Sequence, residues 1–204
     1  GISAGAPALS HLGRSALEAV ELMGVGSNYL RGHVQRDVCI NYAITNAGGI
    51  APNVIPDRAQ VIYLLRANTR KKVSEVFKRL KDIAQGAALM SGASVEYEQS
   101  MGTSELIQNR ALERILYDKL AEIGPVSYND EDISFSRELR KTFPEMAESS
   151  TFDTLKMLYG EIADQIIPQI KGKDINDVVY PYVPIETAKY GSTDVCDVSW
   201  FTPV

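Results

Sequence analysis

Hydrophobic positions recur with two different periods in the first hundred residues. An apolar residue returns every three to four positions over residues 14–32, and this spacing predicts an amphipathic helix. The same spacing over residues 69–92 predicts a second helix, with Thr69 as its N-cap and Gly92 at its end. Both helices should therefore bury one face and leave the other in water.

Patterns typical of β-strands follow each of the two predicted helices. Residues 37–46 alternate apolar and polar side chains, which predicts a half-buried strand, and the large apolar run of residues 58–67 predicts a second strand buried on both faces. Residues 93–101 alternate again and predict a third strand. Because residues 47–57 between the first two are rich in Gly and Pro, they predict a loop. The expected class is α+β, with two helices on one face of an antiparallel sheet.

The second half of the chain has mainly helical patterns. Residues 109–125 and 129–143 each begin with an asparagine, a good N-cap, and predict two helices. Residues 151–167 predict a third helix, which should be broken by Pro168. The tail, residues 178–204, is punctuated by Pro and Gly and predicts short extended pieces.

Charge and cysteine content narrow the classes of protein to consider. The chain has 204 residues and a net charge of −5, and its basic residues are scattered except at residues 70–72, so we expect no nucleic acid partner. No segment approaches the roughly 18 apolar residues of a membrane span. Cys39 and Cys196 have no paired spacing, which favours two reduced thiols in a cytoplasmic protein over a disulfide framework or a thiolate zinc site.

Most residues that could carry chemistry have simpler explanations. Neither of the two histidines, His11 and His33, has an acidic residue at metal-ligand spacing, so a solvated loop histidine is the better interpretation of both. The acidic run at residues 129–132 fits the first turn of a helix better than a pair of catalytic carboxylates. The stretch GVGSNY at residues 24–29 lacks the third glycine of a dinucleotide-binding fingerprint.

Three polar residues remain as candidates for ligand binding. Asn53 lies in the loop between two predicted strands, where its amide either binds a ligand or satisfies the backbone of a turn. Arg66 ends an apolar strand, either as a paired structural charge or as a carboxylate clamp. Asp194 lies in the Gly- and Ser-rich stretch GSTDVCD, which is either part of a site or a plain loop.

Three stretches in this order resemble one known family: LGRSALEAVELMGVG, then GG followed by APNVIPDRAQVIYLLRA, and finally GSTDVCDVSW. They are similar to the metal-dependent amidohydrolases and peptidases that include carboxypeptidase G and aminoacylase, and most of all to the aminobenzoyl-glutamate utilisation branch. The resemblance implies that residues 1–102 form a lid, or dimerisation, domain of ferredoxin-like fold whose first strand is largely missing. Residues 103–204 would be the C-terminal portion of an incomplete, mainly helical catalytic domain.

The resemblance also implies a chemistry for a longer protein. Members use a zinc ion or a similar divalent metal to hydrolyse an amide bond of a small molecule such as aminobenzoyl-glutamate, and they form homodimers through the lid. The motifs that hold the metal in the family do not occur here. We therefore expect a fragment that is inactive by itself and binds no metal, so that its classification as an enzyme stays open.

Carried over by position, Asn53 and Arg66 match lid residues of the family that hold the substrate, and Asp194 matches the acidic residue of the family's GSTD segment. The lid histidine that stabilises the oxyanion of the family's reaction falls on Gly5, so no catalytic residue is expected within this chain. The loss of that donor leaves a second hypothesis open. The chain would then be a non-catalytic, ferredoxin-like dimerisation or small-molecule-binding module.

Overall fold

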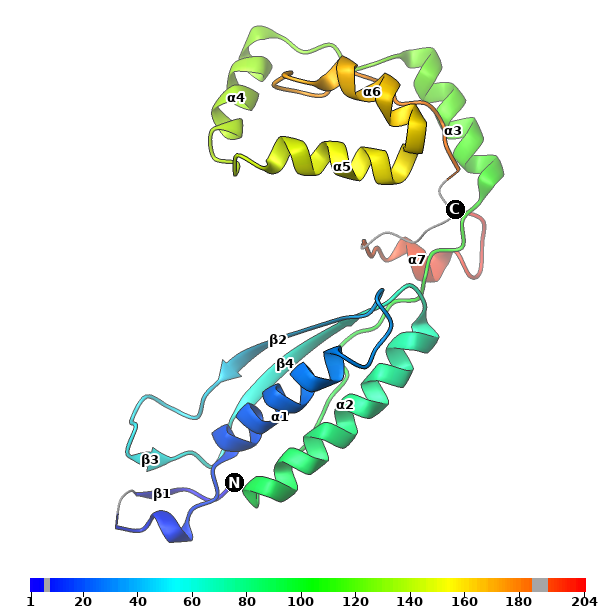
Figure 1. Ribbon diagram of the computed structural model, residues 1–204. Helices are drawn as coiled ribbons and strands as arrows, with labels where there is room; N and C mark the ends of the chain where they lie inside the picture. Colours follow the sequence, from blue (N-terminus) through cyan, green and yellow to red (C-terminus); the bar gives the residue numbers. More distant parts are fainter. Residues whose placement is uncertain (6–7, 185–190) are drawn as a thin grey trace. The chain divides into compact units, whose positions relative to one another are not determined.

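The computed structural model describes residues 1–5, 8–184 and 191–204, which fall into two compact units (Figure 1). Unit 1 comprises Gly1–Ile107 and Lys189–Thr202, and unit 2 comprises Gln108–Ala188 and Pro203–Val204. The chain thus leaves unit 1 after residue 107 and returns to it near the C-terminus. The assignment of residues 1–102 to a lid and of residues 103–204 to a catalytic portion stays a prediction.

Unit 1 is a two-stranded antiparallel ribbon with two long helices along one side of it (Figure 1). This arrangement confirms the expected α+β class, because helices and strands are segregated into separate layers. A second, very short sheet pairs β1 with β3. The elements of unit 1 are β1 (Ala4–Gly5), η1 (Ser10–Leu12), α1 (Ala16–Arg31), β2 (Cys39–Asn46), β3 (Val54–Ile55), β4 (Gln60–Arg66), α2 (Arg70–Ser91) and α7 (Val195–Val198).

The ends of the two long helices follow from local side-chain chemistry. The Ser15 hydroxyl accepts a hydrogen bond from the Glu18 amide at 3.2 Å, and the Thr69 hydroxyl accepts one from the Lys72 amide at 3.4 Å. Each therefore satisfies an amide that the first helical turn leaves without a partner. Gly92 ends α2 with φ +69°, a left-handed conformation that suits glycine. The predicted boundaries of both helices are confirmed.

Small residues let α1 approach the sheet closely, which explains the stretch GVGSNY. Ser27 is completely buried; its hydroxyl donates to the Gly24 carbonyl at 2.9 Å and accepts from the Tyr63 hydroxyl at 3.2 Å. A Cβ atom at Gly24 would lie only 3.1 Å from the hydroxyl oxygen of Tyr42. The Gly and Ser residues that suggested a nucleotide motif therefore serve helix–sheet packing.

The core of unit 1 lies between the helices and one face of the ribbon. Leu30, Ile40 and Val76 are buried there, with Tyr63 and Leu65 of β4 packed beside them. The opposite face of β4 is exposed: Ile62 and Leu64 are 56% and 46% accessible. The prediction that this strand is buried on both faces is therefore wrong, because helices cover only one side of the sheet.

Residues 93–101 form no strand, although their side chains alternate as a strand's would. Within the described residues, β4 pairs only with β2, and no backbone hydrogen bond joins residues 94–107 to another backbone group. A strand requires a ladder of backbone hydrogen bonds to a partner at about 4.8 Å, and this segment makes no such bonds. The prediction of a third strand is therefore wrong, because alternation of side chains does not supply a partner.

Unit 2 is helical, with a small core of its own. Its elements are α3 (Arg110–Ile123), α4 (Asp130–Arg140), α5 (Ala147–Tyr159), η2 (Gly160–Ile162) and α6 (Ala163–Ile170). Leu155, Ala163 and Ile166 are buried at the contact of α5 with α6. Asn129 and Asp132 form a reciprocal capping box, which confirms the interpretation of the acidic run as a helix start.

The third predicted helix of this half breaks at a different residue from the one expected. Gly160, with φ +54°, ends α5, and α6 then continues through Pro168 to Ile170. Pro168 lies near the C-terminal end of a short helix, so its missing N–H costs a single backbone bond there. The left-handed glycine, rather than the proline, therefore interrupts the helical pattern.

An ion pair at one end of the ribbon makes the stability of unit 1 depend on pH. Lys72 donates to Asp37 at 2.7 Å, and this hydrogen bond lowers the pKa of Asp37; the Asn68 amide donates to the same carboxylate oxygen at 3.2 Å. A carboxylate whose pKa is lower in the folded state stabilises the fold above its unfolded pKa of about 3.9. That stability is lost as the pH falls through the folded value.

We expect the substitution Asp37→Asn to reduce the stability of unit 1 at pH 7 and to have little effect near pH 2. The measurement is urea unfolding followed by the fluorescence of Trp200, the single tryptophan, which belongs to unit 1. The difference between the two proteins should shrink as the pH falls. A difference that stays constant from pH 7 to pH 2 would contradict this role of the carboxylate.

Candidate functional site

Asn53 is presented to solvent at the tip of the loop between β2 and β4. It lies in a turn closed by the hydrogen bond from the Val54 amide to the Ala51 carbonyl at 3.2 Å. Among the described residues its side-chain amide makes no hydrogen bond, and the residue is exposed. An amide in this state can donate to one ligand atom and accept from another. The Asn53 side chain therefore does not bond to the backbone of its turn, and its role in ligand binding stays a prediction.

Gly5 lies directly beside this loop. The short strands β1 and β3 pair antiparallel, with Gly5 opposite Val54, the residue that follows Asn53. The Gly5 carbonyl accepts a hydrogen bond from the Leu9 amide at 3.1 Å. A Cβ atom at Gly5 would meet no other atom within 4 Å, so the position has room for a side chain. Two of the positions singled out in the sequence thus come together at one end of unit 1.

Gly48 fixes the path of this loop. Its φ is +90°, and a Cβ atom there would overlap the Cβ of Pro56 and lie 2.8 Å from the Arg58 carbonyl oxygen. The Asn46 side chain accepts a hydrogen bond from the Gly48 amide at 2.7 Å, which stabilises the turn. The loop that carries Asn53 therefore depends on glycine at this position.

We expect Gly48→Ala to destabilise unit 1 by about 1–3 kcal/mol, because alanine is strained at this backbone angle and also collides with Pro56. Urea unfolding followed by Trp200 fluorescence measures the change. Gly49→Ala is the matched control, since Gly49 also has a positive φ, +125°, but a Cβ there meets nothing within 4 Å. Equal losses in the two variants would show that the collision with Pro56 contributes nothing.

Arg66 lies at the other end of β4. It pairs across the ribbon with Cys39 and, by alternation, shares the helix-free face with Ile62 and Leu64. Because β4 has seven residues, its two ends are about 20 Å apart. Asn53, which precedes β4, and Arg66, which ends it, therefore do not meet on one small substrate group within a single chain.

Asp194 is at the N-terminal end of α7, exposed and without a capping hydrogen bond. The residues that attach α7 to the rest of unit 1 are three that the sequence did not single out. Asp197 accepts from the Ser104 amide at 2.9 Å, Ser199 accepts from the Ile107 amide at 2.9 Å, and the Trp200 ring N–H donates to the Glu105 carbonyl at 2.8 Å. No local pattern predicts these bonds, because their partners are more than 90 residues apart.

Residues 104–107, which form the hydrogen bonds to the α7 region, also contact the start of α2. The Glu105 carboxylate accepts a hydrogen bond from the Arg70 amide at 2.9 Å, four residues beyond Arg66. The hydrogen bond from the Ser104 amide lowers the pKa of Asp197, so this carboxylate stays charged at neutral pH. Asp194 and Arg66 therefore belong to the same end of unit 1, opposite to Asn53 and Gly5.

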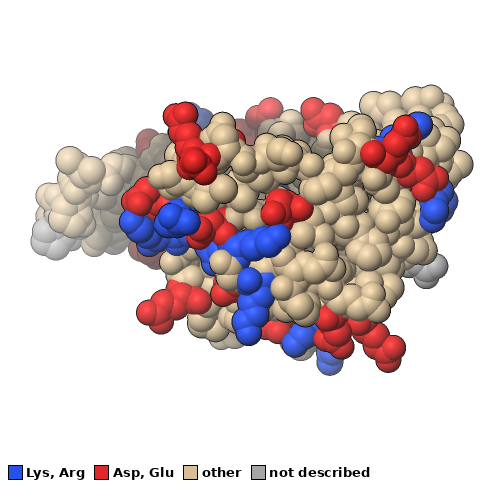
Figure 2. Space-filling model, turned by 90° about the horizontal axis from the view of Figure 1, so that it is seen from above, with Lys and Arg blue, Asp and Glu red and all other residues tan. Residues whose placement is uncertain are grey.

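The described residues contain no group of three or more His, Cys, Asp and Glu side chains that could hold a metal ion. Cys39 and Cys196 are both free thiols. On the face in Figure 2, Lys and Arg side chains lie beside Asp and Glu and are separated by wide areas of other residues. A surface of this kind carries no strong field of one sign. In the described part of the chain, no helix has the length and apolar character needed to cross a membrane.

Comparison with known proteins gives a relative that matches from the first residue to the last. The chain is 36% identical over 204 residues, 100% of its length, to a p-aminobenzoyl-glutamate hydrolase subunit of Escherichia coli (strain K12). The chain belongs to the amidohydrolase and peptidase family. Two further members are similar over a shorter region, the Xaa-Arg dipeptidases of Mus musculus, 31% identical over 86 residues, and Homo sapiens, 33% identical over 84 residues. No model of a known protein family matches the chain.

The chain spans only part of each of these family members. It covers 42% of the length of the hydrolase subunit, and the matched regions cover 20% and 19% of the two dipeptidases. On the side of this chain the dipeptidase matches involve 42% and 41% of the residues. The comparison therefore shows the family of the sequence. The activity of the whole protein is a proposal.

Proposed function

We propose that these residues are the lid and part of the catalytic domain of a longer amidohydrolase that cleaves an amide bond of an N-acyl amino acid such as aminobenzoyl-glutamate. The observation that carries the proposal is the unbroken similarity to a p-aminobenzoyl-glutamate hydrolase subunit over all 204 residues. Within the chain, the free Asn53 amide and the room beside it at Gly5 support a role in substrate contact. Arg66 and Asp194 would bind substrate groups at the other end of the unit.

The exposed, unpaired features of unit 1 support the view that it is a part of something longer. Among the described residues no strand pairs with the outer edge of β4, and residues 94–101 make no backbone hydrogen bond to another segment although their pattern suits a strand. One additional strand beside β4 would complete a sheet with both segments. The short strand β1 would then be either the last part of this additional strand or a strand next to it.

A divalent metal such as zinc would supply an activated water for amide hydrolysis in the complete enzyme. The described residues of this chain do not fit a metal site, because no cluster of ligand-type side chains occurs among them. This chain's own contribution is therefore binding and orientation. Asn53 would donate its amide N–H to a carbonyl or carboxylate oxygen, and Arg66 would pair with a carboxylate.

We also propose that the lid mediates a homodimer. The helix-free face of the sheet exposes Ile62 and Leu64, and the outer edge of β2 has no partner in the described chain. Exposed apolar surface and open edges favour association. Sedimentation velocity at tens of micromolar should give a dimer, with Ile62→Lys shifting it toward monomer and Ile123→Lys, on the exposed surface of unit 2, leaving it unchanged. A monodisperse monomer at that concentration would contradict the proposal.

The direct test is hydrolysis by the complete gene product. We expect the product of the uninterrupted reading frame to release p-aminobenzoate from p-aminobenzoyl-glutamate, and the 204-residue chain alone to be inactive. Absorbance or chromatography of the released aminobenzoate measures the reaction. The proposal would be overturned if the 204-residue chain alone bound zinc tightly and in stoichiometric amount and also showed amidase activity. The chain would then carry the catalytic site and would do more than bind and orient the substrate.

Gly5 favours one rival, a non-catalytic dimerisation or small-molecule-binding module. A lid without its oxyanion donor would lose about two to three orders of magnitude in rate if nothing replaced it. The neighbouring reading frame separates the two hypotheses. An adjoining segment with an H-x-D motif and a Glu-Glu pair supports the enzyme, and a frame without them supports the module. A cytoplasmic location, suggested by the free thiols, fits either one.

A further inference from the structure

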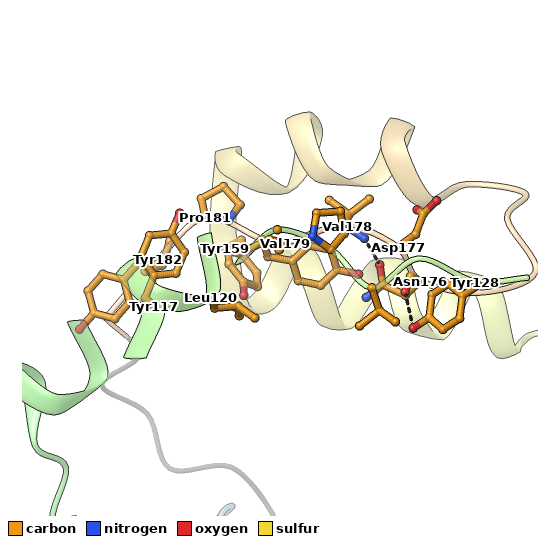
Figure 3. Close-up of a pocket in the computed structure, with 15 residues that line it drawn as sticks. Tyr117, Leu120, Tyr128, Tyr159, Asn176, Asp177, Val178, Val179, Pro181 and Tyr182 are labelled. Atoms are coloured by element: carbon orange, nitrogen blue, oxygen red, sulfur yellow. Dashed lines mark hydrogen bonds between the residues drawn. The ribbon is translucent and has the colours of Figure 1, made fainter. Parts of the chain in front are cut away.

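Unit 2 contains a cavity of about 420 Å³ whose walls are rich in tyrosine (Figure 3). The lining comes from the end of α3 and the loop after it, from the end of α5, and from the extended segment of residues 176–183. Half of the chain's ten tyrosines take part: Tyr117, Tyr128, Tyr159, Tyr180 and Tyr182. The volume lies within the range of small-molecule sites, about 300–1,000 Å³.

The aromatic rings of the cavity are held in place by one another and by hydrogen bonds. Tyr117 and Tyr182 lie with centroids 5.6 Å apart, and Tyr159 and Tyr180 meet edge to face at 6.0 Å. The Tyr182 hydroxyl donates to Glu113 at 3.1 Å, which anchors one pair from outside the lining. Rings fixed in this way lose little conformational freedom when a ligand binds, so more of the contact energy appears as affinity.

The charge of the lining favours an uncharged ligand. The fifteen lining residues include no Lys, Arg or His, and their one carboxylate, Asp177, is paired with Lys173. Arg114 lies over the Tyr117 and Tyr182 rings, 5.6 Å from each centroid, but it is paired with Asp118 at 3.0 Å. An anion would therefore leave water here and compete with a carboxylate for its nearest cation, which is unfavourable. Burial raises the pKa of Tyr159 and of Tyr180, so both phenols stay neutral at physiological pH.

We propose that this cavity binds an uncharged compound built on one planar aromatic ring with a neutral polar group. The paired tyrosine rings would contact the ligand ring by offset or edge-to-face stacking. The phenol hydroxyls and the backbone of residues 176–183 would hydrogen-bond the polar group. The site lies in unit 2, apart from Asn53, Gly5, Arg66 and Asp194 in unit 1, so it depends neither on those residues nor on hydrolysis.

Benzamide and benzoate form a matched pair of probes for this site. Added to the ¹⁵N-labelled 204-residue chain, benzamide should shift amide resonances of residues 117–128 and 176–183. Benzoate should bind roughly tenfold more weakly, because its carboxylate would lose water while the nearest cation, Arg114, is already paired with Asp118. Shifts scattered over both units, no shifts up to the solubility limit of benzamide, or tighter binding of benzoate would overturn the proposal.

Substitutions at Tyr182 test the role of the rings. Tyr182→Ala should weaken benzamide binding about three- to tenfold, whereas Tyr182→Phe keeps the ring and should stay within about twofold of the natural chain. Tyr97→Ala, at an exposed tyrosine of unit 1, is the control and should leave binding unchanged. Native-like spectra of each variant establish folding. If Tyr182→Ala and Tyr182→Phe bound benzamide with equal affinity as folded proteins, stacking on this ring would be excluded.

Discussion

The substitution Ile166→Ala should unfold unit 2 at a much lower urea concentration while unit 1 stays folded. Ile166 is completely buried, and Leu155 and Ala163 are the other buried residues in the described core of that unit. Truncating a buried isoleucine costs about 2–5 kcal/mol, and a core this small has little other burial to compensate. Far-ultraviolet circular dichroism, which reports on both units, should therefore show an early transition.

Two comparisons make this result specific. Trp200 belongs to unit 1, so the midpoint of its fluorescence transition should not move in Ile166→Ala. Ile123→Ala removes the same atoms from a side chain that is 81% exposed, and it should change stability by less than about 0.5 kcal/mol. If both isoleucine variants lost similar stability, or if the tryptophan transition moved together with the helical signal, the separate small core of unit 2 would be excluded.

Features that depend on residues close together in the sequence were predictable. The Thr69 cap on Lys72, the box of Asn129 with Asp132, and the end of α2 at Gly92 each involve residues within about one helical turn. Side chains of these types have a strong local preference for such positions. The sequence therefore predicts the long helices of both units, and these together with the strands give the α+β class. It misses the four-residue helix α7, which lies in the tail that was predicted to form extended pieces.

Features that depend on a distant partner were not predictable in this way. Residues 93–101 have the alternation of a strand but no ladder partner, and Ile62 and Leu64 look like core residues but face away from the helices. The same limit applies to the candidate site. Gly5 meets the loop of Asn53 through the pairing of β1 with β3, about fifty residues apart, and spacing alone does not reveal that pairing.

The structure also sorts the candidate residues into two groups. Gly5 and Asn53 lie at one end of unit 1, whereas Arg66 and the helix that carries Asp194 belong to the other. Of the two side chains in contact with the strands and their loop, Asn53 is exposed and makes no hydrogen bond in the described chain, whereas Arg66 takes part in an interaction. A change at Asn53 therefore separates function from stability more cleanly than a change at Arg66, which ends a strand of the ribbon.

If the complete protein is the hydrolase proposed above, we expect Asn53→Ala to lower kcat about 10²- to 10³-fold, the usual effect of removing a hydrogen-bond donor from a developing oxyanion. Stability should stay within about 0.5 kcal/mol, because the exposed Asn53 side chain makes no hydrogen bond whose loss would disturb the loop. Steady-state hydrolysis of p-aminobenzoyl-glutamate and urea unfolding are the two measurements. A fall in kcat with unchanged unfolding would place the amide in contact with the reacting group.

The control for this variant is Asp57→Ala, an exposed polar residue of the same loop. It should keep kcat within about twofold, because shortening a solvated side chain there leaves the turn at residues 51–54 intact. A rise in KM with constant kcat in Asn53→Ala would instead mean that the amide holds the substrate equally in the ground and transition states. Full activity in Asn53→Ala would show that Asn53 does not contribute to the site. The end of unit 1 that contains Gly5 would then have no polar candidate residue assigned from the sequence.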